Sequence, residues 1–181
     1  FKTSFWIRFS IFNLLLVAFL GLLMRYKIGF EFPLLDQKSL QHSHSHFAFA
    51  GWVSHTLMTL LISFLQKHDL KNNIAFKKYN SILIGNLICS YVMLFSFIIQ
   101  GYGAVSITFS TLSIFASYWF AYVFFKDCKQ IETSSVATKW FKAALFFNAI
   151  SSLGTFALAY MMATKNIHQN EYLASIYYYL H

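Results

Sequence analysis

Three histidines occupy alternate positions close to the start of a long apolar segment. They are His42, His44 and His46, within the stretch LQHSHSHFAFAGW of residues 40–52. Imidazole is a common ligand of haem iron and of transition metals, and near a lipid bilayer it is costly unless it has a partner. The residue type and its position therefore both indicate a bound metal or haem.

The spacing of the histidines decides which of them can act together. Ser39 is expected to cap a helix that starts at about Leu40, so that all three histidines are helical. Residues four apart share a helix face, whereas residues two apart point in nearly opposite directions. His42 and His46 can therefore address one metal centre, which His44 cannot join. His46 is the deepest and the first candidate ligand; the alternative is a hydrated, pH-responsive loop without a ligand.

Two further features of the same segment are candidates for the site. Gly51, which precedes Trp52, lacks a side chain and lets a flat group approach the helix closely. His55 follows about 13.5 Å further along the helix than His46 and about half a turn round, so we expect it near the bilayer midplane on the opposite face. His181 has a similar expected depth, and these two histidines form a candidate pair for a second metal. For His55 alone, the alternative is a hydrogen bond to Ser, Thr or Asn on another helix.

Long apolar runs carry these residues. Of the 181 residues, 57% are hydrophobic and only 11% are charged. A helix needs about 20 residues to cross about 30 Å of hydrocarbon. Five runs are long enough, and a sixth begins before the chain ends: Phe5–Met24, Phe47–Leu65, Ser81–Ile99, Gly101–Phe125, Ala143–Ala163 and Tyr172–His181. The sequence thus predicts an all-α, polytopic transmembrane helical bundle.

The ends of the chain and its domain organisation follow from the same runs. The sixth run is too short to span, and the chain begins on Phe1 rather than Met. We therefore expect residues 1–181 to be a single transmembrane domain truncated at both ends.

The distribution of Lys and Arg predicts the orientation, because short basic loops stay on the cytoplasmic side. If the spans alternate, ten basic residues lie on the side of the N-terminus and four on the other. The N-terminus is then cytoplasmic, in a bacterial-type cytoplasmic membrane. The net charge of +8 reflects this topology, and no basic stripe with interleaved aromatic residues indicates a nucleic-acid partner.

Side-chain amides are few within or beside the five full runs, whereas Ser and Thr are frequent in the fourth run. Asn13, Asn86, Asn148 and Gln100 are expected to make packing contacts between helices. The runs contain no Asp, Glu or Lys, which argues against an ion-coupled transporter because such proteins usually need a buried carboxylate.

The order of these features resembles the start of subunit I of haem-copper oxidases. The shared features are a cytoplasmic N-terminus, Arg25 just beyond the first helix, a short outer loop, and a histidine at the outer end of the second helix. The segment HSHFAFAGW of residues 44–52 is also similar to the His-x-His motif, followed by Gly and an aromatic residue, of NnrS-like haem-copper membrane proteins.

The resemblance implies ligands and a larger protein. His46, or His44 in another register, would be an axial ligand of a low-spin haem, and His181 would bind the active-site metal, copper or non-haem iron. Family members have more helices, about twelve, so this chain would be the N-terminal half. The partner histidines of later helices have no counterpart in it.

The implied function of the intact protein is respiratory. Electrons from a donor protein or quinol would enter a haem near the outer face and pass inward to a haem–metal site that reduces oxygen or nitric oxide, an oxidoreductase reaction carried by the cofactors. Two other functions remain open: a haem- or metal-binding membrane protein that senses, stores or delivers its ligand, and a transporter or scaffold with a histidine-lined vestibule.

Overall fold

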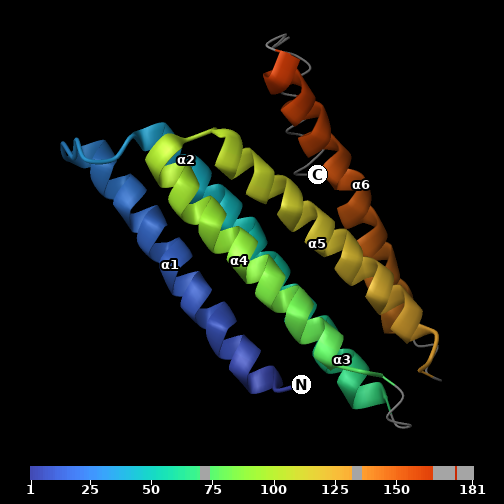
Figure 1. The fold of residues 1–181 in the computed structure, drawn as a ribbon. Helices are drawn as coiled ribbons and strands as arrows, with labels where there is room; N and C mark the ends of the chain where they lie inside the picture. Colours follow the sequence, from blue (N-terminus) through green and yellow to red (C-terminus); the bar gives the residue numbers. More distant parts are fainter. Residues whose placement is uncertain (70–73, 132–135, 165–173, 175–181) are drawn as a thin grey trace. The chain divides into compact units, whose positions relative to one another are not determined.

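A computed structural model describes residues 1–69, 74–131, 136–164 and 174. All elements in these ranges are helical (Figure 1), and in chain order they are α1 (Thr3–Gly29), α2 (Gln37–His46), η1 (Phe47–Ser54), α3 (His55–His68), α4 (Lys77–Gln100), α5 (Ala104–Cys128) and α6 (Val136–Thr164). The chain divides into two compact units, Phe1–Ile131 with α1 to α5 and Glu132–His181 with α6.

Four helices are long and apolar enough to cross a membrane. They are α1, the continuous rod Gln37–His68 that comprises α2, η1 and α3, and then α4 and α5. The prediction of an all-helical bundle of the membrane type is confirmed to this extent. The predicted fifth span, Ala143–Ala163, lies in α6, which is not among the four. Apart from Ala174, the sixth run lies outside the described residues, and so does His181.

The rod that carries the histidines begins earlier than predicted. Its N-cap is Asp36, whose carboxylate accepts a hydrogen bond from the Ser39 backbone N–H at 2.8 Å. The predicted cap at Ser39 is therefore wrong, because Asp36 offers an equivalent acceptor three residues earlier. Hydrogen bonds from the Ser39 backbone and hydroxyl hold the pKa of Asp36 below its usual value.

A π-helix, η1, forms the middle of this rod. Its backbone carbonyls receive hydrogen bonds from both neighbouring helices. Asn13 of α1 donates to the carbonyl of Gly51, and Asn86 of α4 donates to that of Ala50 at 3.0 Å. The two asparagines thus make contacts between helices, as predicted. Both contacts converge on the segment where the helical hydrogen-bond pattern is irregular, and such π segments are frequent at functional sites.

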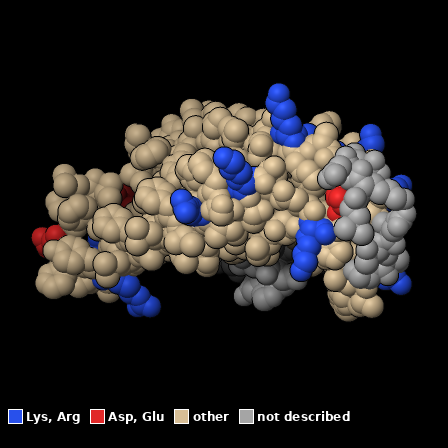
Figure 2. All heavy atoms as spheres, turned by 90° about the horizontal axis from the view of Figure 1, so that it is seen from below, with Lys and Arg blue, Asp and Glu red and all other residues tan. Residues whose placement is uncertain are grey.

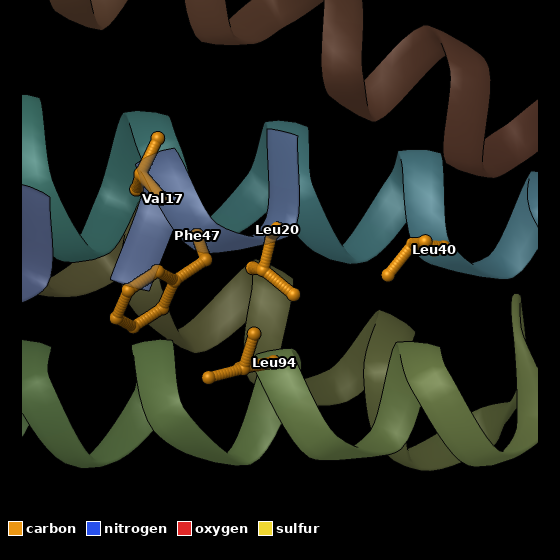
Figure 3. Close-up of a cluster of buried hydrophobic side chains, with 5 residues drawn as sticks. All are labelled: Val17, Leu20, Leu40, Phe47 and Leu94. Atoms are coloured by element: carbon orange, nitrogen blue, oxygen red, sulfur yellow. The ribbon is translucent and has the colours of Figure 1, made fainter. Parts of the chain in front are cut away.

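Apolar packing fixes η1 between α1 and α4. Figure 3 shows a buried cluster in which Val17 and Leu20 of α1 and Leu94 of α4 surround Phe47 of η1, with Leu40 of α2 close by. Phe47 is fully buried. Since lipid gives helices little hydrophobic reason to associate, close packing of this kind and interhelical hydrogen bonds hold such a bundle together.

A buried aspartate joins α4 to α5 at the opposite end of the bundle from His42 and His46. Asp127 accepts hydrogen bonds from the Lys78 ammonium and from the Tyr79 hydroxyl, each at 2.7 Å. Both carboxylate oxygens are therefore satisfied, as a buried charge requires.

The outer surface is largely apolar. Large side chains such as Leu15, Leu22 and Ile99 are exposed, and the face in Figure 2 is mostly uncharged, with Lys and Arg as separate projections. Extensive exposed apolar surface fits contact with lipid.

Candidate functional site

His42 and His46 lie on the face of α2 that meets the turn between α4 and α5. The His42 ring packs edge-on against Tyr102, with 4.5 Å between the ring centroids. The Nε2 atom of His46 lies 3.3 Å from the Tyr102 hydroxyl. As their spacing predicts, the two histidines share a helix face, and both contact the same aromatic side chain.

Phe97 forms a second wall of this cluster. The His46 ring stacks on Phe97, with centroids 4.4 Å apart and an angle of 18° between the planes. Phe97 is fully buried and packs perpendicular to Tyr102. One side of the His46 imidazole is thereby shielded, while its Nε2 remains directed at a hydroxyl group. We call His42, His46, Phe97 and Tyr102 the histidine–aromatic cluster.

A glycine turn positions Tyr102. Gly101 ends α4 with φ of +61°, a conformation that glycine adopts without strain. The Ser106 hydroxyl donates to the Gly101 carbonyl at 2.8 Å and accepts from the Gly103 backbone N–H at 2.8 Å. The turn is therefore closed by its own hydrogen bonds and holds Tyr102 over the start of the histidine rod.

His44 points to a different neighbour. A Cβ atom built on Gly21 of α1 would lie 3.3 Å from Cε1 of His44, so the imidazole packs against α1 where that helix lacks a side chain. This arrangement agrees with the prediction that His44 cannot join the other two. Its Nδ1 atom is buried without a hydrogen-bond partner among the described residues.

An unsatisfied nitrogen is the clearest chemical signal in the cluster. The Nε2 atom of His42 is buried and has no hydrogen-bond partner in the described part of the chain. Buried polar atoms are normally paired, so such an atom calls for a ligand, an ion or a water. Within the same residues, no three His, Cys, Asp or Glu side chains converge as a metal site. An ion here would therefore use the two imidazoles together with the Tyr102 oxygen or water.

Gly51 does make a close approach possible, but to a group of its own helix. A Cβ atom at this position would lie 2.7 Å from Cε2 of Phe47, closer than real side chains tolerate. The flat group beside Gly51 is thus the Phe47 ring, which occupies the space that we assigned to a ligand. This finding weakens the fit of a porphyrin at Gly51.

His55 contacts another helix than His46. Its fully buried ring lies against Trp6 of α1, with centroids 5.6 Å apart, whereas His46 contacts Phe97 and Tyr102. Both ring nitrogens lack a hydrogen-bond partner among the described residues, so the alternative of a bond to Ser, Thr or Asn is not found there. Its predicted partner, His181, lies outside the described residues.

Three positions that contact the histidines were missed from the sequence: Phe97 and Tyr102 in the histidine–aromatic cluster, and Gly21 beside His44. A signal existed for Tyr102, because it lies between two glycines directly after an apolar run, at the end of the bundle where the histidines are expected. Phe97 and Gly21 give no such signal, since each is one aromatic or small residue among many in an apolar run.

No protein-family model, curated protein or solved structure matches this chain in comparisons of its sequence and fold. The fold and the site themselves define a class: an all-helical bundle of the membrane type with a histidine–aromatic cluster at one end of its helices.

Proposed function

We propose that this chain is an integral membrane protein that binds a transition-metal ion through His42 and His46. The buried, unpartnered Nε2 of His42, in a cluster where both imidazoles contact Tyr102, carries this proposal. Two histidines four residues apart on a helix present nitrogens on one face, an arrangement that holds metal ions in other helical sites.

The donor set limits the identity of the ion. Imidazole suits copper, iron and zinc, whereas magnesium and calcium prefer oxygen ligands. A bound copper or iron would supply one-electron chemistry. The protein's part would be to fix the two imidazoles and to exclude water with the Phe97 ring. A protein that binds an ion in this way would sense, store or deliver it.

A second candidate function is that of a haem-copper-oxidase-like protein. In this case His46 would be an axial ligand of a low-spin haem, and the complete protein would transfer electrons from a donor protein or quinol to oxygen or nitric oxide. The motif of residues 44–52 supports this candidate. The Phe47 ring beside Gly51 and the Tyr102 hydroxyl beside His46 argue against it, since a porphyrin would have to displace them.

Single substitutions distinguish the two candidates. The purified chain, from cells supplied with copper, iron and haem, is analysed for metal content and for its reduced-minus-oxidised spectrum. If an ion binds between the two imidazoles, His42→Ala and His46→Ala each remove a ligand and lower its affinity by at least about tenfold, since even the loss of a group that only orients a ligand costs about 10–100-fold. His44→Ala, on the other face of α2, is the matched control and leaves binding unchanged.

Haem ligation gives a different pattern. His46→Ala then abolishes the low-spin haem spectrum, whereas His42→Ala leaves it largely intact. A shift of the reduced spectrum with carbon monoxide would indicate an open coordination position and favour the oxidase candidate. A protein that takes up neither metal nor haem would contradict both candidates and leave a transporter or scaffold.

A further inference from the structure

An apolar groove lies between the first half of α1 and α4, at the end of the bundle remote from the histidine–aromatic cluster. Its volume is about 860 Å³, which falls within the range of about 300–1,000 Å³ of sites that hold small organic molecules. Two hydrogen bonds join α1 to α4 along it, from Trp6 to Asn80 at 3.1 Å and from Tyr91 to Asn13 at 2.7 Å.

The walls of the groove are apolar and accessible. Phe5 and Phe9 of α1 and Ile84 and Ile88 of α4 line it, and their side chains are between 37% and 55% exposed. These residues offer hydrocarbon and aromatic surface without hydrogen-bonding groups. An occupant of this part of the groove must therefore be apolar over its length.

A charged group and an amide lie at one end of the groove, whereas the Tyr91 hydroxyl near the other end is bonded to Asn13. Lys2 is the only charged residue among the described residues that line it. The Trp6 indole donates to the Asn80 side-chain oxygen, which leaves the amide NH₂ of Asn80 as a donor near the same end. The start of α1 is fixed there by a hydrogen bond of 3.2 Å from Gln66 to the Phe1 carbonyl. One end of the groove therefore presents a cation and an amide donor.

The length of the groove matches one leaflet of a bilayer. Its α4 wall runs from Asn80 to Val92, a rise of about 18 Å at about 1.5 Å per residue. Half of a hydrocarbon core of about 30 Å is about 15 Å. With Lys2 at the level of the head groups, the apolar walls then extend to about the middle of the bilayer.

We propose that this groove binds a phospholipid with an anionic head group, held at Lys2, and with an acyl chain along Phe5, Phe9, Ile84 and Ile88. The occupant is defined by complementarity: the cation of Lys2 lies at one end of a groove that is apolar over most of its length and about one leaflet long. A lysine at a membrane surface attracts anionic lipid, and basic pockets between membrane helices hold such head groups. The proposal does not depend on metal or haem binding.

Trp6 lines the groove and serves as the reporter. The chain is reconstituted in phosphatidylcholine vesicles that contain a small fraction of either brominated phosphatidylglycerol or brominated phosphatidylcholine, whose bromine atoms quench nearby indoles. Trp6→Phe, measured in parallel, isolates the Trp6 contribution. The anionic lipid is expected to bind about fivefold more tightly than the zwitterionic one, the factor that one lysine contributes.

Two substitutions at the same end of the bundle test the role of Lys2. Lys2→Gln is expected to remove the preference, so that both brominated lipids quench Trp6 equally. Lys67→Gln is the matched control, because Lys67 is also exposed at this end but does not line the groove, and it should keep the preference.

Two results would overturn the proposal. Equal quenching of Trp6 by the two lipids in the unsubstituted chain would mean that the groove holds ordinary boundary lipid. Protection of Trp6 from both lipids, together with cross-linking of the chain to a second copy, would mean that another protein surface covers the groove.

Discussion

Gly51 has no side chain, and this allows the Phe47 ring to pack against it within the rod Gln37–His68. The Phe47 ring fills the place of a Cβ atom, and the Gly51 carbonyl accepts a hydrogen bond from Asn13. A methyl group here would have to move a fully buried ring that packs against Val17, Leu20 and Leu94.

Gly51→Ala is expected to destabilise the protein. Alanine has the better helix propensity by about 1 kcal/mol, but overpacking of a well-packed core costs about 1–3 kcal/mol. The net loss should be about 1 kcal/mol in the free energy of unfolding, measured in mixed micelles. Combining Gly51→Ala with Phe47→Leu should cost less than the sum of the two single substitutions, because both act on one contact.

Gly85 provides the matched control. It lies in α4, where a Cβ atom would meet nothing within 4 Å. Gly85→Ala should therefore leave stability unchanged or raise it. If Gly51→Ala behaved in the same way, the Phe47 ring would not be fixed against the glycine, and space for a ligand would exist there.

The sequence predicts residue positions well only where the geometry is local. Their spacing of four residues predicts that His42 and His46 share a helix face, and in the structure both contact Tyr102. Tyr102 becomes a neighbour of both through the fold of a turn far along the chain, and no local pattern encodes that distance. Gly51 was predicted to leave open space for a flat ligand. Whether that space exists depends on how the Phe47 ring packs, which the sequence does not show.

At the scale of elements, hydrogen bonds to the carbonyls of η1 stabilise the irregular helix. Asn13 donates one of these bonds, to the Gly51 carbonyl, and its side-chain oxygen accepts a further hydrogen bond from the Tyr91 hydroxyl of α4 at 2.7 Å. These bonds link α1, η1 and α4 in a row. They are the polar counterpart of the apolar cluster around Phe47.

Substitutions in this row should have graded effects. Tyr91→Phe removes one hydrogen bond and should lower the free energy of unfolding by about 0.6 kcal/mol, the average for interhelical bonds in membrane proteins. Asn13→Leu removes two and should cost about twice as much. Unfolding in mixed micelles measures both.

Ser113→Ala is the control for this series. Among the described residues, the Ser113 hydroxyl bonds only to the Ser110 carbonyl of its own helix, so its loss should have little effect. Equal costs for all three substitutions would show that the row of hydrogen bonds does not hold the helices together.

Element boundaries and irregularities were harder to predict than the existence of the helices. Of the five apolar runs predicted to span, four lie in helices long and apolar enough to cross a membrane, because length and hydropathy decide that question. The sequence of η1 is almost uniformly apolar, so it has no alternation of polar and apolar residues whose period could distinguish a π-helix from an α-helix. The start of the rod was predicted three residues too late. Asp36 and Ser39 are both favourable N-cap residues by type, and only the path of the preceding loop selects Asp36.

For the molecule as a whole, the ends of α1 to α5 lie at two opposite ends of the bundle (Figure 1), and the basic residues of these helices divide unequally between the two ends. Hydrogen bonds from Thr3 to Gln66, from Trp6 to Asn80 and from Lys78 to Asp127 bring four helix ends together. Seven described basic residues belong to this end: Lys2, Arg8, Lys67, Lys77, Lys78, Lys126 and Lys129. The end with the histidine–aromatic cluster has three: Arg25, Lys27 and Lys38.

This asymmetry predicts that the N-terminus is cytoplasmic and that the histidine–aromatic cluster faces the opposite side. Lys78 is neutralised by Asp127, yet without it the count is still six to three, and basic residues near short loops resist translocation. In intact cells, a membrane-impermeant maleimide should label Lys38→Cys, whereas Lys67→Cys should react only after the membrane is permeabilised. Both positions are exposed, so accessibility within the fold does not decide the result. The reverse labelling pattern would contradict the orientation and would place the two histidines on the cytoplasmic side, where they would meet cytoplasmic metal pools instead.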